Sequence, residues 1–165
     1  MVHALKYGGW VALAGEMAEP MARTRLPPGL MGSVDGVVPV PLSRTRQRER
    51  GFNQAGVLAS ELAARRSWRV LCGVLTRTRH TRRQARLRAG DRAANVAGAF
   101  EVPAEAGAVI RDACLVLVDD VLTTGATAVA CVEALVGAGA RAVGVITFAR
   151  ARPSLRARVA GGGDV

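Results

Sequence analysis

Residues 115–127 read LVLVDDVLTTGAT and join three kinds of residue in a fixed order. The four apolar residues 115–118 predict a buried strand, which ends at Asp119 and Asp120. A short loop of threonine, glycine and alanine follows, and a helical pattern runs over residues 125–137. Strand, loop and helix in this order are typical of an α/β protein, in which ligands bind beyond the carboxyl ends of parallel strands.

The loop after the two acids has the composition of a phosphate site. The first turn of a helix offers unpaired N–H groups and the positive end of the helix dipole. Gly125 lets the backbone approach an anion closely, and the hydroxyl groups of Thr123, Thr124 and Thr127 can donate to it. The acids would repel a phosphate, so they face sugar hydroxyls, a hard metal ion or a basic side chain. Together these groups suit a ribose 5-phosphate; the alternative is an ordinary turn with capping threonines and solvated acids.

The remaining chain alternates between helical and strand patterns, which favours an open, mostly parallel sheet flanked by helices. Besides the helix after the loop, the expected helices are 3–22 and 53–66. The expected strands are 34–40, 70–75, 99–102, 115–118 and 143–148. On the helix 125–137, Val129, Val132 and Leu135 are expected to share the buried face. Residues 1–150 are expected to form one domain, with 151–165 as a frayed tail.

Two polar segments interrupt this alternation. Residues 43–51 form a short polar stretch after the first strand. Residues 76–94 are rich in arginine and contain almost no large apolar side chain, so a mobile loop or a hairpin is expected there. Residues 44–92 hold 14 arginines and three acids, a net charge of +11, whereas the whole chain carries +10. Such a positive field attracts nucleic acid or a small ligand with several phosphates, although many of these arginines are expected to be solvated.

Several classes of protein are excluded or disfavoured. The sequence has no apolar run of 18 residues and no signal-peptide pattern at its start, so no membrane span and a cytoplasmic location are expected. Its three cysteines, Cys72, Cys114 and Cys131, form no CxxC pair and are expected to be buried thiols. Walker and Rossmann fingerprints are absent. His3 and His80 have no serine or cysteine at a spacing that would indicate a hydrolytic triad.

Residues 116–127, VLVDDVLTTGAT, resemble the motif by which type I phosphoribosyltransferases bind 5-phosphoribosyl-1-pyrophosphate (PRPP). The resemblance implies that Asp119 and Asp120 contact the ribose hydroxyls. It implies that the loop, with Val121, holds the 5-phosphate. The residues that it assigns to the phosphate are Thr123, Thr124, Gly125, Ala126 and Thr127. Mg²⁺ would bridge pyrophosphate oxygens and ribose hydroxyls, and reach the two acids only indirectly.

Other segments resemble the ComF-type proteins, a group named for a role in bacterial DNA uptake. These segments are LKYGG at residues 5–9, VPVPL at 38–42, RGFNQA at 50–55 and the spaced residues T..Q..L....R..N...AF from Thr81 to Phe100. The likeness covers about residues 3–150. The four-cysteine zinc module that often precedes LKY in this family is missing from the sequence given, through loss or a start placed late.

The resemblance also suggests roles outside the motif. The turn after the first strand would hold pyrophosphate, with Pro41, Leu42 and Arg44 as candidates, and Arg50 would point towards the ligand. Pro41 could instead merely end the strand. A closing loop at residues 76–94 would supply an arginine to the pyrophosphate. The candidates are Arg79, Arg82, Arg83 and Arg86, and we name Arg82 as the catalytic one.

Roles for Phe52, Asn53 and the front of the chain are less specific. Phe52 is expected to be a core anchor, and Asn53 is either a helix cap or a ligand contact. A small helical hood within residues 1–33 would hold the acceptor, for which the sequence carries no signature. No repeat or interface pattern fixes the oligomeric state, and a homodimer stays open.

Three functions are compatible with these observations. The first is a Mg²⁺-dependent phosphoribosyltransferase acting on an unknown base or amine. The second is a non-catalytic protein that binds PRPP or a nucleotide and assists DNA uptake, using the arginines of residues 44–92 on single-stranded DNA. The third is a dedicated DNA-binding protein with a vestigial PRPP site. It is the weakest, because only Phe52 and Trp68 could stack on bases in the basic segment.

Overall fold

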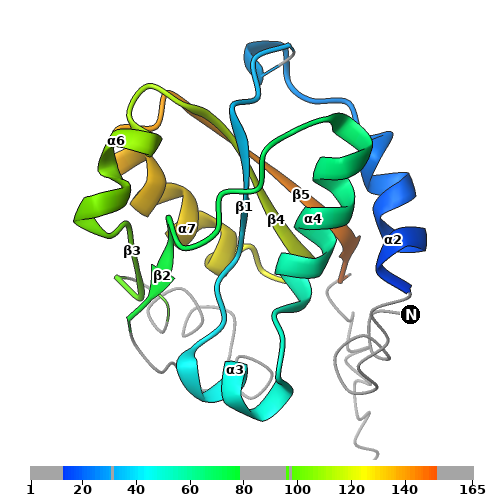
Figure 1. Ribbon diagram of the computed structural model, residues 1–165, viewed down its shortest axis with the longest axis horizontal. Coiled ribbons are helices and arrows are strands. Elements are labelled where there is room, and N and C mark those ends of the chain that lie inside the picture. Colours follow the sequence, from blue (N-terminus) through cyan, green and yellow to red (C-terminus); the bar gives the residue numbers. More distant parts are fainter. Residues whose placement is uncertain (1–12, 31, 79–95, 97, 152–165) are drawn as a thin grey trace, which may run out of the picture.

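The computed structural model describes residues 13–30, 32–78, 96 and 98–151. Figure 1 shows how the elements are arranged. In chain order they are α2 (Leu13–Ala22), the 3-10 turn η1 (Pro28–Leu30), β1 (Gly36–Pro39), α3 (Arg44–Arg50), α4 (Gln54–Arg66), β2 (Thr76–Arg77), β3 (Phe100–Glu101), the 3-10 turn η3 (Ala104–Ala106), α6 (Gly107–Ile110), β4 (Cys114–Leu122), α7 (Ala126–Gly137) and β5 (Ala142–Arg150).

The sheet that organises the fold has the order β1-β4-β5, and both of its pairings are parallel. The strand containing the two acids is therefore the central one. Its apolar half is almost fully buried because both faces are covered by helices, which is the usual state of a parallel strand. The expected α/β fold with a parallel sheet is confirmed.

Two separate apolar layers lie on the two faces of this sheet. On one face, Val116 and Val118 pack with Leu58 and Leu62 of α4 and with Met17 of α2. On the other face, the neighbouring side chains of β4 pack with α7 and with the segment that carries β3. Figure 1 shows β1 between these two groups of elements, with α2 and α4 on one side and α6, α7, β2 and β3 on the other. Alternate residues of β4 thus belong to different layers.

Some predicted strands differ from those observed. The strand predicted at residues 70–75 is wrong: Val70 makes a single parallel bridge to Val37, and the chain then leaves the sheet. Gly73, with φ of +77°, turns the backbone away from an extended path. The strand predicted at 115–118 is longer than expected, because pairing with β5 continues past the acids to Leu122.

The arginine-rich segment is described only at its two ends. There β2 pairs antiparallel with β3, through Thr76 opposite Glu101 and Arg77 opposite Phe100. β3 falls within the strand predicted at 99–102. Residues 79–95 and 97, between the two short strands, lie outside the described residues.

The polar stretch at residues 43–51 is a helix, α3, which the sequence analysis did not predict. Ser43 caps its start, because its hydroxyl accepts a hydrogen bond from the backbone N–H of Arg46 at 3.4 Å. Gly51 ends it with φ of +75° and donates its N–H to the carbonyl of Gln47. A capping serine and a left-handed glycine eight residues later were the missed signals.

Two predictions of burial were wrong. Val129 on α7 is 56% exposed, because α7 turns Ala128, Cys131 and Leu135 towards the sheet instead. Cys72 is exposed rather than buried, whereas Cys114 and Cys131 are buried as expected.

Within the described residues, no helix combines the length and the apolar character needed to cross a membrane. The helix predicted at 3–22 is observed over Leu13–Ala22, and the rest of that prediction falls on residues outside the description. The predicted tail at 151–165 also lies outside it, apart from Ala151.

Candidate functional site

The carboxyl ends of β1 and β4 lie side by side at one end of the sheet. Pro39 pairs with Val118, and the N–H of Val40 donates to the carbonyl of Val118 at 2.9 Å. This register places the turn after β1 next to the two acids of β4. The turn predicted to bind pyrophosphate and the acids predicted to bind ribose are thus neighbours in space.

A cleft of about 660 Å³ opens at this end of the sheet. Its walls come from the turn after β1, from α3, from the start of α4, from β2 and from the β4–α7 loop. The residues that line it are Val40, Pro41, Leu42, Arg46, Glu49, Arg50, Phe52, Asn53, Gln54, Ala55, Arg77, Asp119, Asp120, Val121, Leu122, Thr123, Gly125, Thr127 and Ala128.

Most of the predicted site residues therefore lie together. Thr124 and Ala126 belong to the same loop but do not line the cleft. Arg44 is the first residue of α3, and its side chain is outside the description. Arg82, like the other loop arginines proposed with it, lies outside the described residues.

The acid pair is held in place by the strand that carries it. Asp119 is half-buried, and its Oδ1 accepts a hydrogen bond from the backbone N–H of Asp120 at 2.9 Å. The side chain of Asp120 is buried, with 7% of the residue exposed. Because β4 stays extended here, successive side chains point to opposite faces of the sheet. Asp119 continues the layer of α7, and Asp120 continues the layer of α4.

The start of α7 has the geometry expected of an anion site. Gly125 precedes the helix with φ of +83°, a conformation that suits glycine, and no side chain caps this helix start. Gly125 has no side chain, so the residue before the helix cannot itself occupy the space in front of the first turn. Thr123 and Thr127 line the cleft beside this turn. Loop and helix together can hold a phosphate through backbone N–H and hydroxyl donors.

Among the residues that the structure describes, three arginines line the cleft: Arg46 and Arg50 from α3, and Arg77 from β2. The Arg77 guanidinium stacks over the Phe100 ring, 5.2 Å from its centroid. Burial lowers the pKa of Arg77, and the neighbouring positive charge of Arg46 lowers it further. A guanidinium keeps its proton at neutral pH, so this lowering reports an electrostatic cost that a bound anion would relieve.

Sequence reasoning missed four of the polar lining residues: Arg46, Glu49, Gln54 and Arg77. The first two lie on the unpredicted helix α3, where the capping signals would have placed them. Arg77 stands just before the loop candidates and is fixed by β2 instead. Gln54 was quoted in the RGFNQA segment without a role. For Gln54, burial was the missing information, and the sequence does not supply it.

The structure also distinguishes between the roles considered for Phe52 and Asn53, the two residues before Gln54. Asn53 is a helix cap: its Oδ1 accepts from the N–H of Ala55 at 3.1 Å, and its Nδ2 donates to the carbonyl of Val40 at 3.0 Å. Phe52 is only half-buried, lines the cleft and belongs to neither apolar layer. The core role expected for Phe52 is therefore wrong, because Phe52 precedes α4 at the rim of the cleft.

The donor set at the acid pair decides which metal would fit. Among the described residues, no group of three or more histidine, cysteine or acidic side chains could enclose a metal ion. The acids suit Mg²⁺, which usually keeps several waters and would reach Asp119 or Asp120 through them. The residues present thus fit a Mg²⁺ ion that arrives with a phosphorylated ligand.

Known proteins of two names resemble the chain in sequence. No protein-family model matches it. It is 37% identical over 93 residues to Competence protein F of Haemophilus influenzae, which covers 56% of this chain and 40% of that protein. It is 33% identical over 159 residues to DNA utilization protein YhgH of Salmonella typhimurium, and 32% identical over 156 residues to that of Escherichia coli. Each of these two alignments covers 91% of this chain and 66% of the relative.

The chain belongs to the ComF-type family. It spans between 40% and 66% of the length of these ComF-type relatives. A solved structure of Leishmania donovani UMP synthase superposes on 89% of this chain and 28% of that one, with 14% identity and a TM-score of 0.44. The family assignment rests on the sequence relatives, and the parallel α/β fold on the strand order of the chain itself.

Proposed function

We propose that the chain binds PRPP and transfers its phosphoribosyl group to a nitrogen acceptor with release of pyrophosphate. The observation that supports this most is the single cleft in which two carboxylates, a helix start without a side-chain cap and three guanidinium groups lie together. PRPP has three parts: a ribose, a 5-phosphate and a pyrophosphate. Each kind of group in the cleft complements one of them.

The three parts are assigned by charge. Asp119 and Asp120 accept hydrogen bonds from ribose hydroxyls, because carboxylates repel phosphate. The N–H groups at the start of α7, with Thr123 and Thr127, hold the 5-phosphate. The turn at Pro41 and the cleft arginines hold pyrophosphate. Mg²⁺, when bound, would neutralise part of the pyrophosphate charge.

The reaction breaks the bond from C1 of the ribose to a pyrophosphate oxygen, and pyrophosphate leaves with the electron pair. A nitrogen lone pair of the acceptor forms the new bond to C1, and the acceptor nitrogen then loses a proton. Fixed positive groups around the leaving oxygen lower the barrier, because they stabilise charge that develops in the transition state. Arg46, Arg50 and Arg77 are the described residues that can do so.

The experiment that tests this proposal measures pyrophosphate release. The protein is incubated with PRPP, Mg²⁺ and a panel of bases and amines, and free pyrophosphate is followed by a coupled assay. We expect release that depends on one class of acceptor. Measurable PRPP binding without release from any acceptor would contradict the transferase function.

A second function is favoured by the names of the relatives. Competence protein F and DNA utilization protein YhgH are both named for the handling of DNA. The alternative is an accessory protein of DNA uptake that binds PRPP or a nucleotide without catalysis and contacts single-stranded DNA through its arginines. It predicts PRPP binding, no pyrophosphate release and a measurable affinity for DNA.

A further inference from the structure

Gln54, the first residue of α4, is a buried polar side chain in the wall of the cleft. Only 2% of the residue is exposed. Its Nε2 has no hydrogen-bond partner in the described part of the chain, although the residue lines the cleft. A buried amide that donates to nothing destabilises the folded state, so such groups are normally paired. Among the described residues, Nε2 of Gln54 is thus a donor without an acceptor.

The position of this amide is fixed by its neighbour. Asn53 caps α4 through the N–H of Ala55 and ties the helix start to the end of β1 through the carbonyl of Val40. Gln54 follows directly, in the first turn of a helix of 13 residues. The backbone at Gln54 is therefore anchored, and its side chain is buried in the wall of the cleft.

The layering of the sheet shows which acid lies on the same side of the cleft as Gln54. Helix α4 packs its Leu58 and Leu62 on Val116 and Val118 of β4. Asp120 is two residues beyond Val118 and so belongs to the same face of the strand. Arg77 and the start of α7 flank the opposite face. Gln54 and Asp120 therefore share the α4 side of the cleft, opposite Arg77 and the start of α7.

An amide donor and a carboxylate acceptor on one side of a cleft complement a hydroxyl group. A hydroxyl donates one hydrogen bond and accepts through its lone pairs. We propose that Gln54 is a ribose-binding residue: its Nε2 donates to a ribose hydroxyl oxygen of the bound phosphoribosyl compound, and that hydroxyl donates to Asp120. This inference rests on the proposed PRPP function. It accounts for a buried amide that has no partner among the described residues.

The test compares variants of two glutamines. Gln54→Leu removes the amide at similar size, and Gln54→Glu replaces the donor with an acidic group. Gln47→Leu, at an exposed position on α3, is the matched control. Calorimetry measures the dissociation constants for PRPP, ribose 5-phosphate and inorganic pyrophosphate. We expect Gln54→Leu to weaken the binding of PRPP and of ribose 5-phosphate about tenfold. Gln54→Glu should weaken the binding of both compounds more, since it places a second negative charge on the side of the cleft that holds Asp120. Pyrophosphate binding should not change.

Thermal unfolding without ligand gives a second readout. The Gln54→Leu variant should melt at the same temperature as wild type or higher, because the unpaired donor is gone. Wild-type affinity for PRPP in this variant, an equal loss for pyrophosphate, or a lower melting temperature with unchanged binding would overturn the inference alone. A wild-type protein that binds neither PRPP nor ribose 5-phosphate would overturn the inference together with the proposed function.

Discussion

Cys131 lies near Asp119, on the inner face of α7. Burial raises the pKa of its thiol, and the nearby carboxylate of Asp119 raises it further. Cys131 therefore stays a neutral thiol at pH 8. Because the folded pKa lies above the unfolded one, its contribution to stability is present below about pH 8.5 and declines as the pH rises above that value.

This predicts the reactivity of the three thiols. In the native protein at pH 8, we expect Ellman's reagent to modify Cys72 rapidly and the buried Cys114 and Cys131 slowly. Thiolate fraction and access both control the rate. All three should react after denaturation, and Cys72→Ser should remove the rapid phase. A second rapid thiol in the native protein would show that the layer containing Cys114 or Cys131 is open to the reagent.

At the scale of elements, the loop from β4 to α7 depends on one backbone conformation. Gly125 has φ of +83°, and a Cβ there would meet nothing nearer than Leu122 Cδ1 at 3.9 Å. Gly125→Ala should therefore cost about 1–2 kcal/mol of unfolding free energy through backbone strain and not through a clash. It should also weaken PRPP binding, because the N–H groups of the first turn move.

The matched control is Gly137→Ala in the last turn of the same helix. A Cβ at Gly137 meets nothing within 4 Å. This substitution should leave PRPP binding unchanged and raise the unfolding free energy by about 0.5 kcal/mol, since alanine favours helix. Urea denaturation and calorimetry measure both quantities. Equal effects of the two substitutions would contradict a special role for the turn at Gly125.

The helices and strands predicted from the sequence match the observed ones only in part. The strand at 115–118, the helix after it and the helix at 53–66 were predictable, because apolar spacing there is strong and the bounding glycines and caps are typical. Helix α3 escaped prediction because its polar face meets the cleft and it has no apolar stripe. The strand at 70–75 failed because β-branched residues alone do not reveal the turn at Gly73.

For the site, the β4–α7 loop was predictable because one contiguous segment carries it. Gln54 and Arg77 were not, since their placement depends on the packing of α4 and on the pairing of β2 with β3. Such long-range burial leaves no local pattern in the chain.

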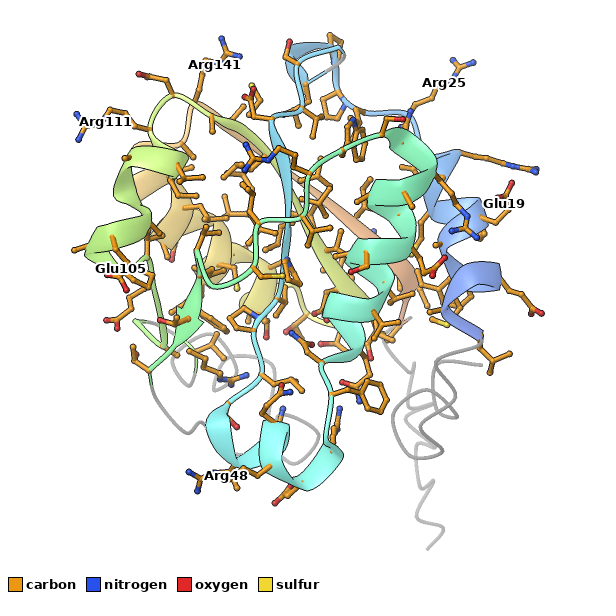
Figure 2. The ribbon with its side chains drawn as sticks, in the orientation of Figure 1. Glu19, Arg25, Arg48, Glu105, Arg111 and Arg141 are labelled. Carbon is orange, nitrogen blue, oxygen red and sulfur yellow. The ribbon has the colours of Figure 1, made fainter. Side chains whose placement is uncertain are left out.

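At the scale of the whole molecule, exposed arginines lie at both ends. Figure 2 shows Arg48 on α3, at the end that carries the cleft, and Arg25, Arg111 and Arg141 at the opposite end. If the DNA alternative holds, single-stranded DNA should bind near the cleft, within the basic segment. We expect Arg48→Gln to weaken the binding of a single-stranded oligonucleotide, measured by fluorescence anisotropy. Arg111→Gln should leave that affinity unchanged.

Salt provides the control for this prediction. Affinity for the oligonucleotide should fall steeply between about 50 and 200 mM salt, and the slope should decrease by about 1 in Arg48→Gln. Equal losses of oligonucleotide affinity in Arg48→Gln and Arg111→Gln would contradict preferential binding of DNA at the end of the molecule that carries the cleft.

The central claim is that the two acids of β4 hold the ribose of PRPP. Its most direct test is a calorimetric titration of PRPP with Mg²⁺ into wild type and into the Asp119→Asn, Asp120→Asn double variant. Asparagine keeps an Oδ1 acceptor for the 2.9 Å hydrogen bond from the N–H of residue 120, so the fold should persist. We predict saturable binding by wild type and a loss of about 10- to 100-fold in the variant, because hydrogen bonds to charged groups are strong. Equal affinity of the two proteins, or no binding by wild type, would contradict the account.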